Sequence, residues 1–158
     1  MSTVRKPGPL HVLGLGAAMV AVAAAPLALA IPADAATASN GCVVNPLQPT
    51  NAGVVVGVKQ VRYDFQVACA ANRTIEVQQM LFEEDAPPDP DDFTATQITS
   101  KKFINASAGT LGMIRSLPNT EAGNEEVYQR TRFRVSVNGG APSAWTLFES
   151  GAIRSIAN

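Results

Sequence analysis

The fold is decided most clearly by residues 126–145, EVYQRTRFRVSVNGGAPSAW. Alternate residues over 127–137 are mostly apolar, and the residues between them include three arginines. A strict period of two is typical of a half-buried β-strand, since a helix would scatter both sets around its axis. Residues 138–140, NGG, tolerate positive φ, so we predict a tight hairpin that returns as a second strand over 144–148. We expect the single tryptophan, Trp145, to pack in the core.

Shorter stretches of the same character occur through the rest of the chain beyond residue 50. They predict strands over 54–58, 61–69, 74–82, 93–103 and 110–116, and a tail over 151–158 that completes a sheet. After the first 35 residues, no segment of eleven or more keeps a helical apolar period. These features indicate an all-β protein, an immunoglobulin-like antiparallel β-sandwich of about seven strands with one disulfide.

The apolar phase changes between the first two of these predicted strands. The alternating apolar residues of 54–58 are even-numbered, whereas those of 61–69 are odd-numbered. Because a slip of one residue exchanges the two faces of a strand, we predict a bulge or tight break near residues 59–60.

The first 35 residues have the organisation of a secretory signal peptide. Two basic residues precede an alanine-rich apolar run over 10–31. Ala33 and Ala35 are small residues at the two positions that a signal peptidase recognises. An uncleaved membrane anchor is the alternative, since the run is long enough to span a bilayer. Pro26 and His11 within the run disfavour that alternative, and we expect cleavage after Ala35.

Three segments follow from this interpretation. We predict a signal peptide over 1–35, a proline-punctuated lead-in over 36–50 and a single β-sandwich domain over 51–158. Pro46 and Pro49 should limit the lead-in to edge or irregular pairing. The 123 residues left after cleavage can bury a core, and their expected location is secreted, that is, extracellular.

The chain has two cysteines, Cys42 and Cys69, and both remain after the expected cleavage. An exported protein with two thiols usually pairs them, so we expect one disulfide and no free thiolate. On the chain-entropy model, closing a loop of this length stabilises the fold by about 3.5 kcal/mol.

The chain lacks residues that most catalytic classes require, and their absence excludes those classes. Its one histidine, His11, lies in the expected leader, so the domain has no imidazole for a catalytic triad or a typical zinc site. Phosphate-binding and dinucleotide-binding glycine motifs are absent from the sequence. The net charge after cleavage is about −2, which is too balanced to favour nucleic acid. We expect no enzyme, no cofactor and no nucleic-acid partner.

A proline-rich acidic segment over 83–92 is the first candidate site. Its carboxylates belong to Glu83, Glu84, Asp85, Asp89, Asp91 and Asp92. Several oxygen ligands can bind a hard cation, but the spacing does not match a calcium loop and three prolines restrict convergence. We therefore favour a solvated, self-repelling loop and no metal site.

Three arginines of the opening stretch, Arg130, Arg132 and Arg134, form the second candidate, a possible anion-binding face. Alternate residues of a strand lie roughly 6.6 Å apart on one face, so the guanidinium groups form a row. Such a row can bind carboxylates or phosphates of an anionic polymer. The competing interpretation is that these arginines pair with acids on neighbouring strands, Asp64 and Glu76.

The alanine-rich leader, Cys42 and Cys69 flanking the first strands, and the VSVNGG turn near the end carry a resemblance. With them the chain resembles the small secreted one-disulfide β-sandwich proteins of unknown function common in actinobacteria. The resemblance implies a fold and an extracellular address and supplies no catalytic residues. The chain departs from the antibody type, because both cysteines precede the third predicted strand.

These features together predict a secreted, non-catalytic β-sandwich interaction module that associates with the cell envelope. Its expected partner is a cell-envelope polymer or a secreted protein, and no membrane span is expected after cleavage. The alternative is a small secreted inhibitor or effector that acts on a partner enzyme through one loop.

Overall fold

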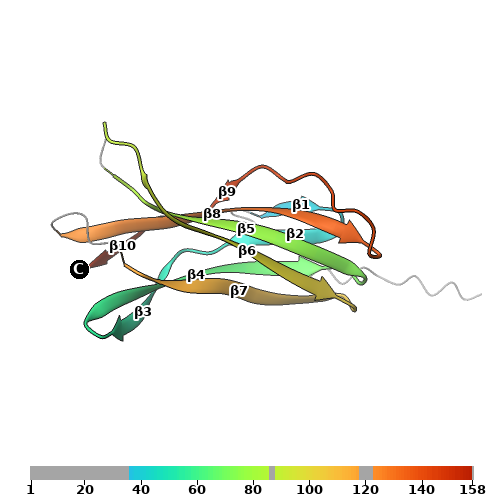
Figure 1. Ribbon diagram of the computed structural model, residues 1–158, viewed down its shortest axis with the longest axis horizontal. Helices are drawn as coiled ribbons and strands as arrows, with labels where there is room; N and C mark the ends of the chain where they lie inside the picture. Colours follow the sequence, from blue (N-terminus) through green and yellow to red (C-terminus); the bar gives the residue numbers. More distant parts are fainter. Residues whose placement is uncertain (1–35, 86–87, 118–122, 158) are drawn as a thin grey trace, which may run out of the picture.

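The computed structural model describes residues 36–85, 88–117 and 123–157. The predicted signal peptide, 1–35, lies outside the described residues. Within the described residues the protein is all-β, with ten strands and no helix. Two antiparallel sheets form a sandwich with one disulfide, which confirms the prediction of an all-β sandwich (Figure 1).

Sheet A contains β1 to β4 and β7, and sheet B contains β5, β6 and β8 to β10. The strands are β1 (Thr37–Ser39), β2 (Cys42–Pro46), β3 (Thr50–Val55), β4 (Val58–Cys69), β5 (Arg73–Glu83), β6 (Asp92–Phe103), β7 (Ser107–Ser116), β8 (Asn124–Val137), β9 (Glu149–Ser150) and β10 (Arg154–Ala157).

The long strand β4 is the centre of sheet A. Its residues 60–69 pair with β7 along one edge. Along the other edge, β2 pairs with residues 65–69 and β3 pairs with residues 58–62, so β2 and β3 lie end to end. β1 pairs only with β2. The strands β3 and β7 are therefore edge strands of this sheet.

In sheet B, β5 lies between β6 and β8. The free edge of β8 is lined by β9 and β10, which pair with residues 130–131 and 124–127. Ile156 of β10 is buried, so the C-terminal tail completes this sheet as predicted. The β3–β4 and β5–β6 hairpins project at the same end of the molecule (Figure 1).

Alternating residues of both sheets build two apolar clusters between the layers. The first contains Cys42, Val44, Phe65, Val67, Cys69, Ile75, Val77, Phe103, Phe133 and Val135. The second contains Val61, Tyr63, Leu81, Met113, Leu117, Val127 and Ile156. The odd-numbered residues of β8 face this core, which confirms the face assignment made from the period of two.

Two glutamines lie in the core as well, although glutamine is rarely buried. Gln79 Nε2 donates to the side-chain oxygen of Gln129 and to the Tyr63 carbonyl at 2.9 Å. Gln129 Nε2 donates to the carbonyls of Leu47 and Asp64 at 2.7 and 2.6 Å. Side chains of sheet B thus bond directly to the backbone of sheet A, at the point where the chain leaves β2.

The predicted disulfide between Cys42 and Cys69 is present. The two residues are direct partners in the β2–β4 register, and their Cα atoms are 4.1 Å apart. The bond therefore joins neighbouring strands of one sheet, whereas the disulfide of antibody domains joins the two sheets.

The segment predicted as a lead-in, 36–50, takes part in the sandwich. It supplies β1 and β2, and β2 lies between β1 and β4 instead of at an edge. Cys42 and Val44 point inward and give β2 a buried face. Pro46 is the last residue of β2, so the missing N–H of proline disturbs only its end.

The bulge predicted near residues 59–60 is present in the pairing of β3 with β4, but its extra residue belongs to β3: Asn51 pairs with Val61 and Gly53 pairs with Gln60. β4 runs continuously from Val58, and the change of phase occurs at a turn over Val56 and Gly57, where φ is 47° and 76°. The valines in this turn and on both sides of it are 46% to 96% exposed, so they do not belong to the core.

The turn predicted over 138–140 is confirmed, with φ of 51° and 75° at its first two residues. The returning strand predicted over 144–148 is wrong, because this segment follows β8 as irregular backbone. Side-chain oxygens of Ser143 and Thr146 accept hydrogen bonds from N–H groups of β8 at 3.1 and 3.0 Å. These hydroxyls take the place of strand carbonyls until pairing resumes at β9.

Candidate functional site

The three arginines of the second candidate project from β8 on the outer face of sheet B. We call Arg130, Arg132 and Arg134 the arginine face. The residues between them on β8 are buried in the core, so the backbone of a hydrogen-bonded central strand holds the three side chains outward. Each of the three has a different set of partners.

Arg134 has an acidic partner. Its Nη2 atom lies 2.6 Å from a carboxylate oxygen of Glu76 on β5, and the two side chains are 33% and 34% exposed. Its guanidinium also lies 4.8 Å from the centre of the Trp145 ring. The predicted pairing with Glu76 is therefore confirmed for this arginine. A pair at this exposure contributes at most about 1 kcal/mol.

Arg132 is held by neutral groups. Its Nε donates to the side-chain oxygen of Gln78 at 2.7 Å. The guanidinium lies 4.6 Å from the centre of the Phe148 ring and 5.1 Å from that of Trp145. None of these partners carries a negative charge, so they do not neutralise the positive charge of Arg132.

Arg130 is exposed and contacts two aromatic rings. Its guanidinium lies 5.0 Å from the ring centre of Phe82 and 5.4 Å from that of Tyr128. These rings stack at 5.2 Å, and Phe93 packs edge-on against Phe82 at 5.8 Å. Arginine over an aromatic face gains a cation–π attraction while the N–H donors at its rim stay available.

Tyr128 connects this aromatic cluster to the acidic segment. Its hydroxyl donates to a carboxylate oxygen of Asp91. Burial, followed by this hydrogen bond, raises the pKa of Tyr128 to about 12. The phenol is therefore neutral at physiological pH, and the contact fixes the base of the acidic segment against sheet B.

Two expectations from the sequence are wrong, one for a partner of the arginines and one for the place of the tryptophan. Asp64 lies on β4 in sheet A, so it cannot pair with arginines of sheet B. Trp145 is not a core residue; it is partly exposed on the outer face of sheet B, beneath Arg132 and Arg134. The irregular segment that follows β8 places the indole on this outer face.

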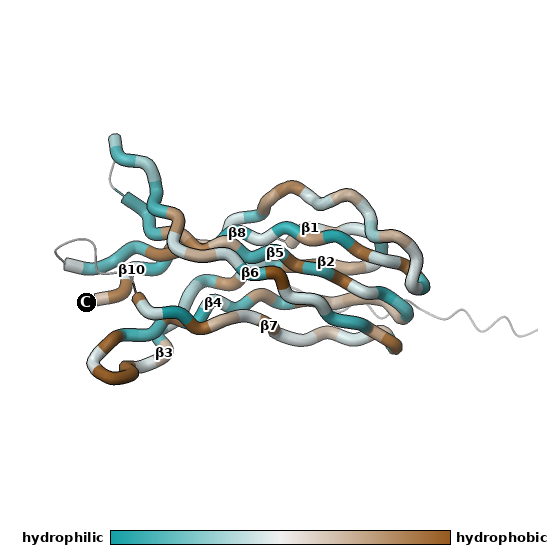
Figure 2. Tube along the Cα trace, viewed as in Figure 1, coloured by the Kyte–Doolittle hydropathy of each residue, from teal (hydrophilic) through white to brown (hydrophobic). Residues whose placement is uncertain are grey.

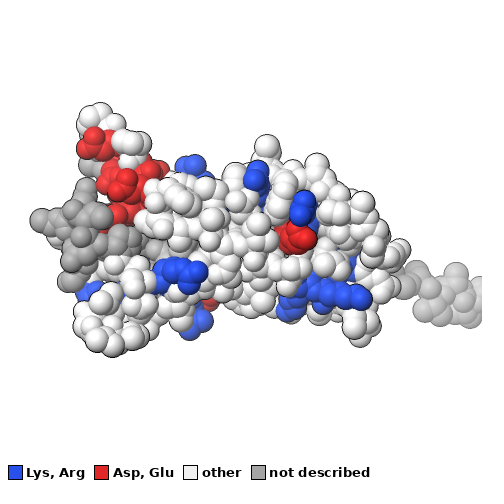
Figure 3. Space-filling model, viewed as in Figure 1, with Lys and Arg blue, Asp and Glu red and all other residues white. Residues whose placement is uncertain are grey.

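The acidic segment is divided between the core and the surface. Glu83 ends β5 and is buried, whereas Asp89, Asp91 and Asp92 are exposed. Figure 3 shows acidic side chains gathered at one end of the molecule, where the β5–β6 hairpin projects. No group of three metal-ligating side chains occurs among the residues that the structure describes.

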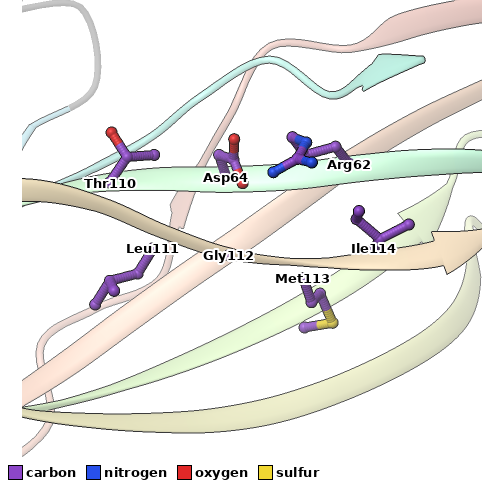
Figure 4. Close-up of a pocket in the computed structure, with 7 residues that line it drawn as sticks. All are labelled: Arg62, Asp64, Thr110, Leu111, Gly112, Met113 and Ile114. Atoms are coloured by element: carbon purple, nitrogen blue, oxygen red, sulfur yellow. The ribbon is translucent and has the colours of Figure 1, made fainter. Parts of the chain in front are cut away.

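A shallow hollow of about 410 Å³ lies on the outer face of sheet A, over Gly112. Arg62, Asp64 and Ile114 project around it, as Figure 4 shows, and Met113 points to the other side of the strands. A Cβ atom at Gly112 would lie 2.2 Å from the carbonyl oxygen of Tyr63. Because residue 112 has no side chain, β7 can approach the backbone of β4 this closely beside the hollow.

No protein-family model matches this chain, and no curated protein matches it either. In the part of the chain that the structure describes, no helix is long and apolar enough to cross a membrane. On sheet B, the described residues bring charged guanidinium groups over aromatic rings.

Proposed function

We propose that the chain is a secreted, non-catalytic interaction module of the immunoglobulin-like type whose arginine face binds an anionic polymer of the cell envelope. The supporting observation is that Arg130 and Arg132 contact neutral groups, namely aromatic rings and the Gln78 amide. Their charges are therefore available to a ligand, in contrast to that of Arg134.

The chemistry of these contacts favours a polyanion. Guanidinium groups bind carboxylates, sulfates and phosphates through paired N–H donors, and a ring beneath the guanidinium fixes its plane. Arg130 and Arg132 are separated by roughly 6.6 Å along a strand, so successive anionic groups of an extended polymer can engage both.

A pair of matched double variants tests the proposal. Arg130→Gln with Arg132→Gln removes two charges from sheet B and leaves the Arg134–Glu76 ion pair in place. Arg62→Gln with Arg115→Gln removes two charges from exposed positions of sheet A and is the control. Dextran sulfate serves as the polyanion and uncharged dextran as the neutral comparison, with binding measured by calorimetry over a series of salt concentrations.

We expect the sheet B variant to lose roughly tenfold or more in affinity for dextran sulfate, because each charge-assisted contact contributes about 1 kcal/mol or more. The control variant should bind nearly as wild type, and the wild-type affinity should fall steeply with salt. Equal losses in both variants would mean that net charge alone attracts the polymer. Unchanged binding in the sheet B variant would exclude the arginine face.

Secretion has its own test. Protein recovered from culture fluid should begin with Ala36, because the small residues at Ala33 and Ala35 mark the expected cleavage site. N-terminal sequencing gives the answer directly. Recovery only in the membrane fraction with residue 1 or 2 at the start would contradict the proposed location.

A further inference from the structure

An apolar ribbon projects from sheet A. We call residues 50–58 the valine ribbon; it comprises β3, its turn and the first residue of β4. Val54, Val55, Val56 and Val58 are 61%, 58%, 96% and 46% exposed. They are four of the twelve large hydrophobic side chains exposed among the described residues, and Figure 2 shows the apolar tip.

The turn of this ribbon contains an unfavourable residue. Val56 has φ of 47° and precedes Gly57 at 76°. A β-branched side chain in the left-handed region costs roughly 1–2 kcal/mol. The same chain places asparagine before glycine at two other turns with nearly the same φ values, Asn40–Gly41 and Asn138–Gly139. A valine at the first position therefore supplies apolar surface at the expense of local stability.

The ribbon is also an open sheet edge. β3 pairs with β4 on one side, and its other side has no partner among the described strands. Residues 50–58 contain no charged side chain. The other long edge strands carry charges, with Lys101 and Lys102 on β6 and Arg115 on β7. Charges of this kind normally protect an edge from pairing with another chain.

We propose that the valine ribbon is the interface between two copies of this chain, with β3 of one copy pairing antiparallel to β3 of the other about a two-fold axis. In a two-fold contact the same surface of each copy forms the interface, and a residue near the axis lies close to the same residue of the other copy. Any charge near the axis would therefore meet an equal charge. The uncharged ribbon avoids this repulsion. Backbone hydrogen bonds would fill the open edge while the valines of both copies leave water.

The oligomeric state of the secreted protein, which should begin with Ala36, tests this proposal without any foreign ligand. Wild-type protein should sediment as a dimer that dissociates on dilution. Val55→Lys should be monomeric, because lysines of both copies would meet at the interface. Ile98→Lys is the matched control, since Ile98 on edge strand β6 is 59% exposed against 58% for Val55. This control variant should dimerise as wild type.

Val56→Asn separates association from folding. Asparagine suits the positive φ, so the melting temperature of the dilute, monomeric protein should rise while self-association weakens roughly tenfold or more. If Val56 served only the fold of the hairpin, the substitution would change the melting temperature and the strength of self-association in the same direction, or would leave self-association unchanged. Unchanged association in this variant and in Val55→Lys would overturn the proposal.

A cross-link tests the pairing itself. Both native cysteines are bonded, so Val54→Cys adds one reactive thiol, which mild oxidation should link to its copy as a disulfide dimer. Ile98→Cys should not link. A wild-type protein that stays monomeric at every concentration would overturn the proposal. So would ribbon-dependent binding of the monomer to phosphatidylcholine–phosphatidylglycerol vesicles, which would make lipid the partner of the valines.

Discussion

Gln79 of β5 donates a side-chain hydrogen bond to Gln129 of β8 in the middle of the core, and both amides also bond to backbone carbonyls of sheet A. Apolar contacts are non-directional, whereas these hydrogen bonds have fixed geometry. The glutamine pair therefore fixes how the two sheets sit on each other between two apolar clusters.

Replacing Gln129 by leucine should destabilise the protein by about 1–3 kcal/mol, because the buried carbonyl of Leu47 and the amide of Gln79 lose a partner. Gln79→Leu should cost a similar amount. The double variant should cost clearly less than the sum, since the second substitution removes a group already left unpaired. Urea unfolding of all four proteins measures this coupling, and additive costs would contradict it.

Gly112→Ala should destabilise by roughly 1–3 kcal/mol, because the new methyl group meets the backbone of β4. A Cβ at Gly109, on the same strand, lies 3.6 Å from the flexible end of Lys101. Gly109→Ala is therefore the control and should have little effect. Thermal unfolding of the two variants compares them, and equal melting temperatures would show that β7 shifts freely.

Replacing Cys42 and Cys69 together by serine should lower the free energy of unfolding by about 2–4 kcal/mol. The loss should be much smaller when reduced wild-type protein is the reference, because that protein already lacks the cross-link. Urea unfolding with and without reductant measures both. A native protein that reacts with two equivalents of alkylating agent before reduction would contradict the bond.

Tyr128 should make stability depend on alkaline pH. Its pKa is about 12 in the folded protein and about 10 in the unfolded chain, so both states are protonated below about pH 10. Between about pH 10 and 12 only the unfolded state loses this proton, so stability falls as pH rises. Tyr128→Phe should reduce the slope measured by urea unfolding in this range. An unchanged slope would mean that the other tyrosine of the chain, Tyr63, carries it.

The fold is predicted best where a local sequence pattern is compatible with one structure only. In β8, five consecutive inward residues from Val127 to Val135 alternate with polar neighbours, and the predicted faces are confirmed. The disulfide could be predicted because the chain has only two cysteines and thiols of exported proteins usually pair. Its place within one sheet could not, because sequence spacing does not define which strands are neighbours.

Other features depended on tertiary context. The valines of the ribbon have the apolar pattern of a buried strand, but β3 extends beyond the cover of sheet B and leaves them exposed. Trp145 was expected in the core because a lone tryptophan usually packs there. It instead lies beneath two guanidinium groups, a neighbourhood created by residues on β8 and an irregular segment. Period and composition carry no signal for such a contact.

The disulfide has a mechanical consequence. It joins the first residue of β2 to the last residue of β4, and only β1 precedes it in the described chain. Tension applied through the N-terminal side would reach Cys42 and pass through the covalent bond into β4, which has neighbours on both edges. Separation of strands under this tension would stop once the three residues of β1 had come away from β2. A molecule tethered from this side would resist shear while the bond is oxidised, and would unzip along β2 once it is reduced.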